Sequence, residues 1–323
     1  MKYFEDEGTG RQQLIFFWYD VARHGPPVEV MQWAREQGYT TLWNDIIAPF
    51  VCQLAAENGQ LQALQFLRES GCPWDNGTCR AAAGHGYLHI LQWARENGCP
   101  WNQYTCAAAA HNGHLSILRW VRANGCEWGK ETCEYAARNG HLSIFQWARE
   151  SGCDWDKDTC TAAAKSGNIS ILKWARESGC AWDTDTWAAA ARHGHLLILQ
   201  WARENGCKWD KQTCDGAARN GHLSILKWAR ENGCVWDHWT CAYAAEGGQI
   251  SCLQWARENG CPWNEETCSL AAGSGHLSCL KWARENGCPW DEETYAYAAY
   301  TASYGHLSCL KWARENGCPE HDN

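Results

Sequence analysis

The sequence predicts an all-α solenoid built from about eleven short helix–turn–helix units. The first observation is a 27-residue period, because the motif Trp-Ala-Arg-Glu, or a close variant of it, recurs at that spacing from Trp93 to Trp282. The second is a threonine that recurs with the same period from Thr78 to Thr294. The third is a glycine between two helix-forming stretches. Self-similarity at a period of about 20 to 50 residues is typical of solenoids.

Residues 101–128 show why each element of a unit is expected. Residues 105–111 are rich in alanine, which has the highest helix propensity, and therefore predict a first helix. Gly113 supplies the backbone freedom that a tight turn requires. The apolar residues from Leu115 to Val121 have the spacing of one face of a second helix, which Asn124-Gly125 ends. One such pair cannot bury its own apolar stripe, so neighbouring units are expected to stack.

The repeated pattern T-C-x-x-A-A-x-x-G-H-L-x-I-L-x-W-A-R-E-N-G-C-P-W-D resembles the ankyrin repeat. The unit has 27 residues where that family has about 33, and the missing residues fall between positions such as Trp74 and Thr78, where the family forms a β-hairpin. The resemblance therefore predicts an ankyrin-type solenoid with shortened hairpin links. Short arrays of this kind are similar to those of large DNA viruses and of protists. The resemblance also implies a concave surface on which variable residues select a partner.

The two ends of the chain differ from the repeating units. We expect an N-terminal tail at residues 1–10, the repeat array at residues 11–317 and a C-terminal tail at residues 318–323. Residues 14–19, Leu-Ile-Phe-Phe-Trp-Tyr, are strongly hydrophobic, whereas a terminal repeat should have a polar outer face. Either residues 1–13 fold over this stretch, or it contacts a partner.

Composition argues against several functional classes. The formal charge of −9 is unlike that of proteins that bind nucleic acid through general phosphate attraction. No apolar run is long enough to span a membrane, and the N-terminus is acidic where a secretion signal would be basic. The 21 cysteines then predict thiols in the cytoplasm, or in the host cytoplasm if the chain is viral. No catalytic constellation, phosphate-binding loop or zinc motif interrupts the repeats, so we expect no enzyme activity, cofactor or metal.

Three abundant residue types occupy fixed positions in the repeat. Nineteen of the 23 tryptophans fall at two positions of the unit, which predicts that they form the stacking core. Trp187 takes a position that is usually cysteine and is also expected in the core. Most cysteines follow the turn glycine or the repeat threonine, and we expect small buried thiols. Six histidines share the turn position, where Gln or Asn replaces histidine in other units, so we expect them to hydrogen-bond the turn backbone.

Positions that vary between units are the candidates for partner recognition. A basic stripe is predicted at the sixth position after the repeat threonine, where four consecutive units have a cation. Aromatic residues, which often anchor interfaces, also occur at variable positions. The predicted partner-binding residues are Tyr104, Glu134, Tyr135, Arg138, Lys165, Arg192, Arg219, His238, Trp239 and Tyr243.

Two functions are compatible with these residues. The first is a scaffold that binds another protein on the concave face of the solenoid. The second is a binder of an acidic ligand or of nucleic acid through the basic stripe. The overall negative charge favours the first.

Overall fold

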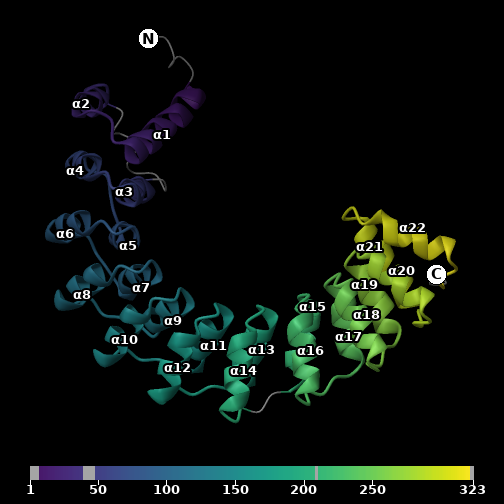
Figure 1. The fold of residues 1–323 in the computed structure, drawn as a ribbon. Coiled ribbons are helices and arrows are strands. Elements are labelled where there is room, and N and C mark those ends of the chain that lie inside the picture. The colour runs from purple at the N-terminus through teal and green to yellow at the C-terminus, as the bar shows by residue number, and fades with distance from the viewer. Residues whose placement is uncertain (1–6, 39–47, 208–209, 321–323) are drawn as a thin grey trace. The chain divides into compact units, whose positions relative to one another are not determined.

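The protein consists of paired α-helices that follow one another along the chain (Figure 1). The computed structural model describes residues 7–38, 48–207 and 210–320, and these residues form no β-strand. The chain divides into two compact units, residues 1–159 and 160–323. The helices are α1 (Glu7–His24), α2 (Val28–Glu36), α3 (Ala48–Glu57), α4 (Leu61–Glu69), α5 (Asn76–Gly84), α6 (Leu88–Glu96), α7 (Gln103–His111), α8 (Leu115–Ala123), α9 (Glu131–Arg138), α10 (Leu142–Glu150), α11 (Lys157–Lys165), α12 (Ile169–Glu177), α13 (Thr184–Arg192), α14 (Leu196–Glu204), α15 (Lys211–Arg219), α16 (Leu223–Glu231), α17 (His238–Glu246), α18 (Ile250–Glu258), α19 (Glu265–Gly273), α20 (Leu277–Glu285), α21 (Glu292–Ala302) and α22 (Leu307–Glu315).

Local signals in the sequence begin and end these helices. The Asn102 side chain accepts a hydrogen bond from the backbone N–H of Tyr104 and caps α7, and Asp237 caps α17 in the same way. Gly113 and Gly125 have φ angles of 85° and 82°, the left-handed conformation that glycine adopts most easily. The predicted helix pair is therefore confirmed, and the link between α6 and α7 contains no strand.

The helices form two layers in each unit. Odd-numbered helices, the first of each pair, pack closely on the first helices of neighbouring pairs, whereas contacts between second helices are sparse. Small side chains explain the close packing, because each first helix from α3 onward contains two or more alanines. Within each unit the helix pairs follow a curve, and the first helices lie on its inner side (Figure 1).

The core is aliphatic rather than built from tryptophan. Fully buried positions are taken by Ile and Leu of the second helices, such as Ile117 and Leu118, and by Ala, Cys and Thr of the first helices. Trp187 is also fully buried, as expected. Most tryptophans at the two repeating positions are only half-buried, so the prediction that they form the stacking core is wrong. Trp209 lies outside the described residues.

The half-buried tryptophans form clamps between links and second helices. Trp101 of the link packs edge-to-face on Trp120 of α8, with ring centroids 5.9 Å apart. Arg95 lies over the Trp101 ring at 4.4 Å and donates a hydrogen bond to the Cys99 carbonyl. The arrangement recurs in other repeats, for example around Trp128 and Trp263. These clamps attach the link to the second helices on either side of it, α6 and α8.

The cysteines have a structural role. All 21 are thiols that take part in no disulfide, and 20 of them are buried. The Cys99 thiol donates a hydrogen bond to the carbonyl of Asp75, which caps the preceding first helix. A hydrogen bond with Cys99 and burial raise the pKa of the Cys79 thiol, which makes it unreactive. The expectation of small buried thiols is confirmed.

The turn histidines connect consecutive repeats. His114 Nε2 donates to the carbonyl of Gly84 at 3.2 Å, and His222 Nε2 donates to that of Arg192 at 3.0 Å. A carbonyl oxygen only accepts, so these rings have their proton on Nε2. The expected role in holding the turn backbone is confirmed for His114, His141, His195 and His222.

The N-terminal repeat retains exposed hydrophobic surface. Residues 7–13 form the beginning of α1 itself, so they do not fold back over the hydrophobic stretch. Trp18 is buried, whereas Phe16 is 60% exposed. Residues 1–6 lie outside the described residues, and the choice between a cover and a partner at this end stays open.

We expect Gly247→Ala to destabilise the fold more than the same substitution at an ordinary turn glycine. A Cβ atom at Gly247, which follows α17, would overlap the backbone carbonyl oxygen of Arg219. The two backbones would have to separate, at a cost of about 3 kcal/mol. Gly233→Ala is the matched control, because its φ is 82° but no atom lies within 4 Å, so that only backbone strain of roughly 1–2 kcal/mol is expected. Urea unfolding followed by circular dichroism measures both, and equal losses would contradict the close approach.

Candidate partner-binding surface

The predicted partner-binding residues lie on the first-helix layer of both units. Tyr104 is on α7, and Glu134, Tyr135 and Arg138 are on α9 of the first unit. In the second unit, the predicted residues are Lys165 on α11, Arg192 on α13, Arg219 on α15, and His238, Trp239 and Tyr243 on α17. Seven of the ten line one of two pockets, each within a single unit. Glu134, Lys165 and His238 line neither.

The first pocket is a groove of about 450 Å³ above α5 and α7. Its floor consists of Ala81, Gly84, Ala107 and Ala108, whose small side chains leave the space open. Tyr104, Tyr135 and Arg138, all predicted from the sequence, line it. The other lining residues are Gln53, Glu57, Arg80, His85, His111 and Asn112. We name it the α5–α9 groove.

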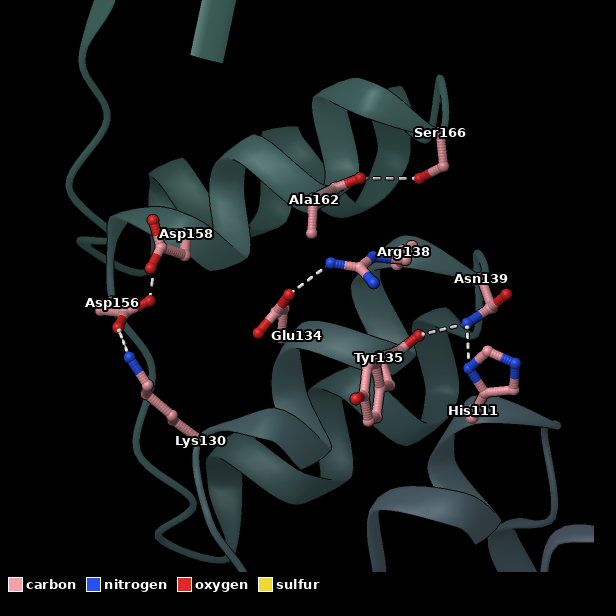
Figure 2. A network of polar contacts seen from close by, with 10 residues as sticks. All are labelled: His111, Lys130, Glu134, Tyr135, Arg138, Asn139, Asp156, Asp158, Ala162 and Ser166. Carbon is pink, nitrogen blue, oxygen red and sulfur yellow. Dashed lines mark hydrogen bonds and ion pairs between the residues drawn. The ribbon is translucent and has the colours of Figure 1, made fainter. Parts of the chain in front are cut away.

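Polar contacts fix the side chains of α9 at this groove (Figure 2). Arg138 Nη2 donates to Glu134 Oε1 at 2.5 Å, and its guanidinium lies 5.6 Å from the Tyr135 ring centroid. The Tyr135 ring packs edge-to-face on His111, with centroids 5.5 Å apart. The groove therefore has a preformed aromatic wall.

A second ion pair lies at the opposite end of α9 (Figure 2). Lys130 Nζ donates to Asp156 Oδ2 at 2.6 Å. This hydrogen bond raises the pKa of Lys130 and lowers the pKa of Asp156. Lys130 thus joins consecutive repeats, because its partner lies in the link that precedes α11.

The second pocket, of about 330 Å³, lies above α15. Its predicted members are Arg192, Arg219, Trp239 and Tyr243, and the remaining lining residues are Lys211, Gln212, Asp215 and Gly216. The Trp239 and Tyr243 rings stack with centroids 5.5 Å apart. Gly216 leaves room for Arg192, whose Cγ would lie 2.8 Å from a Cβ at this position. We name it the α15 pocket.

Asp215 is a buried acid in the α15 pocket that the sequence analysis missed. Its side chain is 8% exposed, and Thr240 Oγ1 donates to Asp215 Oδ1 at 2.6 Å. Burial raises the pKa of Asp215 to about 6, and the Thr240 hydrogen bond opposes this rise. The sequence does contain a signal that Asp215 is unusual. Most other units have a small or hydroxyl-bearing residue at this position, as in Ala107, Ala188 and Ala242.

The basic stripe is partly neutralised by neighbouring acids. Arg219 pairs with Glu246 of the next first helix at 2.5 Å, as Arg138 pairs with Glu134. Lys165 and Arg192 form no ion pair with any residue that the structure describes. The stripe is therefore less positive than its cations alone suggest, because two of its four members have a carboxylate within hydrogen-bond distance.

No helix among the residues that the structure describes is long and apolar enough to cross a membrane. No group of three or more His, Cys, Asp or Glu side chains in the same residues is placed to hold a metal ion.

Comparison with known proteins gives one class of match. No protein-family model matches the sequence, and neither does any of the curated proteins. Solved structures that are similar include the human ASB11 ankyrin repeat domain, with a TM-score of 0.41, 16% sequence identity, and coverage of 49% of this chain and 84% of that domain. The helix pairs of the chain itself, with their 27-residue period, show an all-helical repeat array.

Proposed function

We propose that this chain is a non-catalytic scaffold that binds another protein through the first-helix layers of its two units. The observation that supports this proposal most directly is the gathering of variable residues in the α5–α9 groove and the α15 pocket. Each combines a pair of aromatic side chains with arginine, and Tyr, Trp and Arg are the residues that most often dominate the binding energy of an interface. The abundance of buried thiols supports a reducing compartment such as the cytoplasm.

The ion pairs of the stripe favour a protein partner over nucleic acid. Arg138 and Arg219 already have carboxylate partners, so phosphates would have to compete for them. The two functions differ in salt dependence. Binding to nucleic acid should weaken steeply with salt because counterions are released, whereas an interface anchored by aromatic residues should weaken little.

Site-directed photocrosslinking tests the proposal. A photoreactive phenylalanine analogue replaces Tyr104 or Trp239 in the full-length chain, and Leu197 on the second-helix layer, which is 70% exposed, is the control position. Adducts that form in native host cells at Tyr104 or Trp239 but not at Leu197 are expected, and mass spectrometry identifies the partner. Adducts at Leu197 alone would place the interface on the other layer and contradict the proposal.

Affinity measurements with the captured partner then test the hot spots. The double variants Tyr104→Ala/Tyr135→Ala and Trp239→Ala/Tyr243→Ala are each expected to weaken binding by about 30-fold or more if they remove hot spots of about 2 kcal/mol. Leu197→Ala should leave the affinity unchanged. Full affinity in both double variants, or a steep salt dependence, would exclude an aromatic-anchored protein interface.

A further inference from the structure

The described lining of the α5–α9 groove contains two arginines, Arg80 and Arg138, and one carboxylate, that of Glu57. Arg80 of α5 lines it and forms no ion pair with any described residue. Glu57 is the only carboxylate among the described lining residues, and its Oε1 already accepts a hydrogen bond from Gln53 at 2.7 Å. The acid nearest to Arg138 is Glu134, which is paired with it. An arriving anion would therefore find Arg80 without an ion-pair partner among the described residues, with Glu57 as the one carboxylate of the described lining.

The hydrogen bonds of His111 add a second donor at the groove (Figure 2). Asn139 Nδ2 donates to the Tyr135 carbonyl at 2.9 Å, which identifies this atom as the amide nitrogen, and it also donates to His111 Nδ1 at 3.1 Å. His111 Nδ1 is then an acceptor, so the neutral ring has its proton on Nε2. Because His111 is exposed, its Nε2–H is available to a ligand.

Aromatic surface accompanies these donors. Tyr104 is 48% exposed, and Tyr135, whose ring packs on His111, lines the same groove. A volume of about 450 Å³ accommodates one large side chain together with the backbone that presents it. The groove thus offers apolar surface beside a cation and an N–H donor.

We propose that the α5–α9 groove binds an oxyanion-bearing side chain of the partner, a carboxylate or a phosphate, through Arg80 and His111 Nε2–H. Tyr104 and Tyr135 contact the apolar part of the same side chain. A guanidinium offers several donors in a fixed plane, which suits both kinds of oxyanion. This inference rests on the proposed function for its biological setting, but the chemistry of the groove is tested without any partner.

Small aromatic ions are the probes. The full chain is labelled with ¹³C at histidine Cε1, the His111 signal is assigned from a His111→Gln variant, and phenyl phosphate, phenylacetate and benzylammonium are titrated at constant pH and low ionic strength. The two anions are expected to shift the His111 signal saturably, whereas benzylammonium should not. The stronger of the two anions indicates whether a phosphorylated or a carboxylate side chain is the better occupant.

Variants of single arginines locate the site. Arg80→Gln is expected to weaken anion binding by about tenfold or more, because it removes a charge-assisted hydrogen bond. Arg119→Gln is the matched control, since Arg119 lies on the second helix α8 away from the groove, and it should leave binding unchanged. Circular dichroism shows that both variants are folded.

Three outcomes would overturn the inference: no saturable shift with either anion, equal binding of benzylammonium, or equal affinity in the Arg80→Gln variant. Its failure is distinguishable from that of the proposed function. Partner crosslinking at Tyr104 or Trp239 without anion binding would refute only the oxyanion site. Anion binding without any crosslinked partner would leave the groove chemistry intact and refute the scaffold.

Discussion

Trp187→Ala is expected to lower the free energy of unfolding by about 3–5 kcal/mol, the range for removing a buried aromatic side chain. Trp187 is 1% exposed and packs edge-to-face on Trp182, with ring centroids 4.6 Å apart. The loss combines the hydrophobic transfer energy of the indole with the cavity that its removal leaves between rigid helices. Urea unfolding followed by circular dichroism measures the change.

Leu197→Ala is the control for this variant. Leu197 lies on the adjacent helix α14 and is 70% exposed, so its truncation should change stability by no more than about 0.5 kcal/mol. A loss below about 1 kcal/mol for Trp187→Ala would show that the neighbouring helices collapse into the space and that the indole is dispensable.

Asp215→Asn is expected to stabilise the protein at pH 7 by up to about 3 kcal/mol. Burial raises the pKa of Asp215 to about 6, compared with roughly 4 in an unfolded chain. A difference of about two units corresponds to roughly 3 kcal/mol at neutral pH. Asparagine removes the buried charge, and its side-chain oxygen still accepts the hydrogen bond from Thr240.

The pH dependence has a defined sign. The folded state holds the Asp215 proton more tightly than the unfolded state, so protonation stabilises the fold. The contribution of Asp215 is therefore most favourable below pH 4 and is lost as the pH rises from about 4 to about 6. In Asp215→Asn this decline should be absent.

Asp156 provides a control of opposite sign. The hydrogen bond from Lys130 lowers the pKa of Asp156, so its contribution is present at neutral pH and is lost as the pH falls below about 4. Asp156→Asn should destabilise the protein at pH 7. If Asp215→Asn also destabilises it there, the Asp215 carboxylate is compensated by the surrounding Arg192, Lys211 and Arg219, and the predicted cost of burial is wrong.

The helix pairs follow from the sequence because their signals are local. Alanine-rich stretches, capping residues such as Asn102 and glycines such as Gly113 act on the backbone within a few residues, so each repeat specifies its own helices and turn. The 27-residue period then specifies that neighbours stack. The turn histidines and buried cysteines were also predictable, because each recurs at one position of the repeat and one role explains that position in the units that have it.

The surface could not be derived in the same way, because several of its contacts join residues of consecutive repeats that lie 25 to 28 positions apart. Most tryptophans proved half-buried, since their burial depends on the Arg–Trp–Trp geometry of a link and a second helix. Pairing of Arg219 with Glu246, the hydrogen bond from Thr240 to Asp215 and the donor state of His111 each require the next repeat to be in place. The period of the sequence thus determined the order of helices and turns, and it showed which positions vary between units. The stacking of repeats determined which of those side chains meet, because charge and burial depend on neighbours in space rather than along the chain.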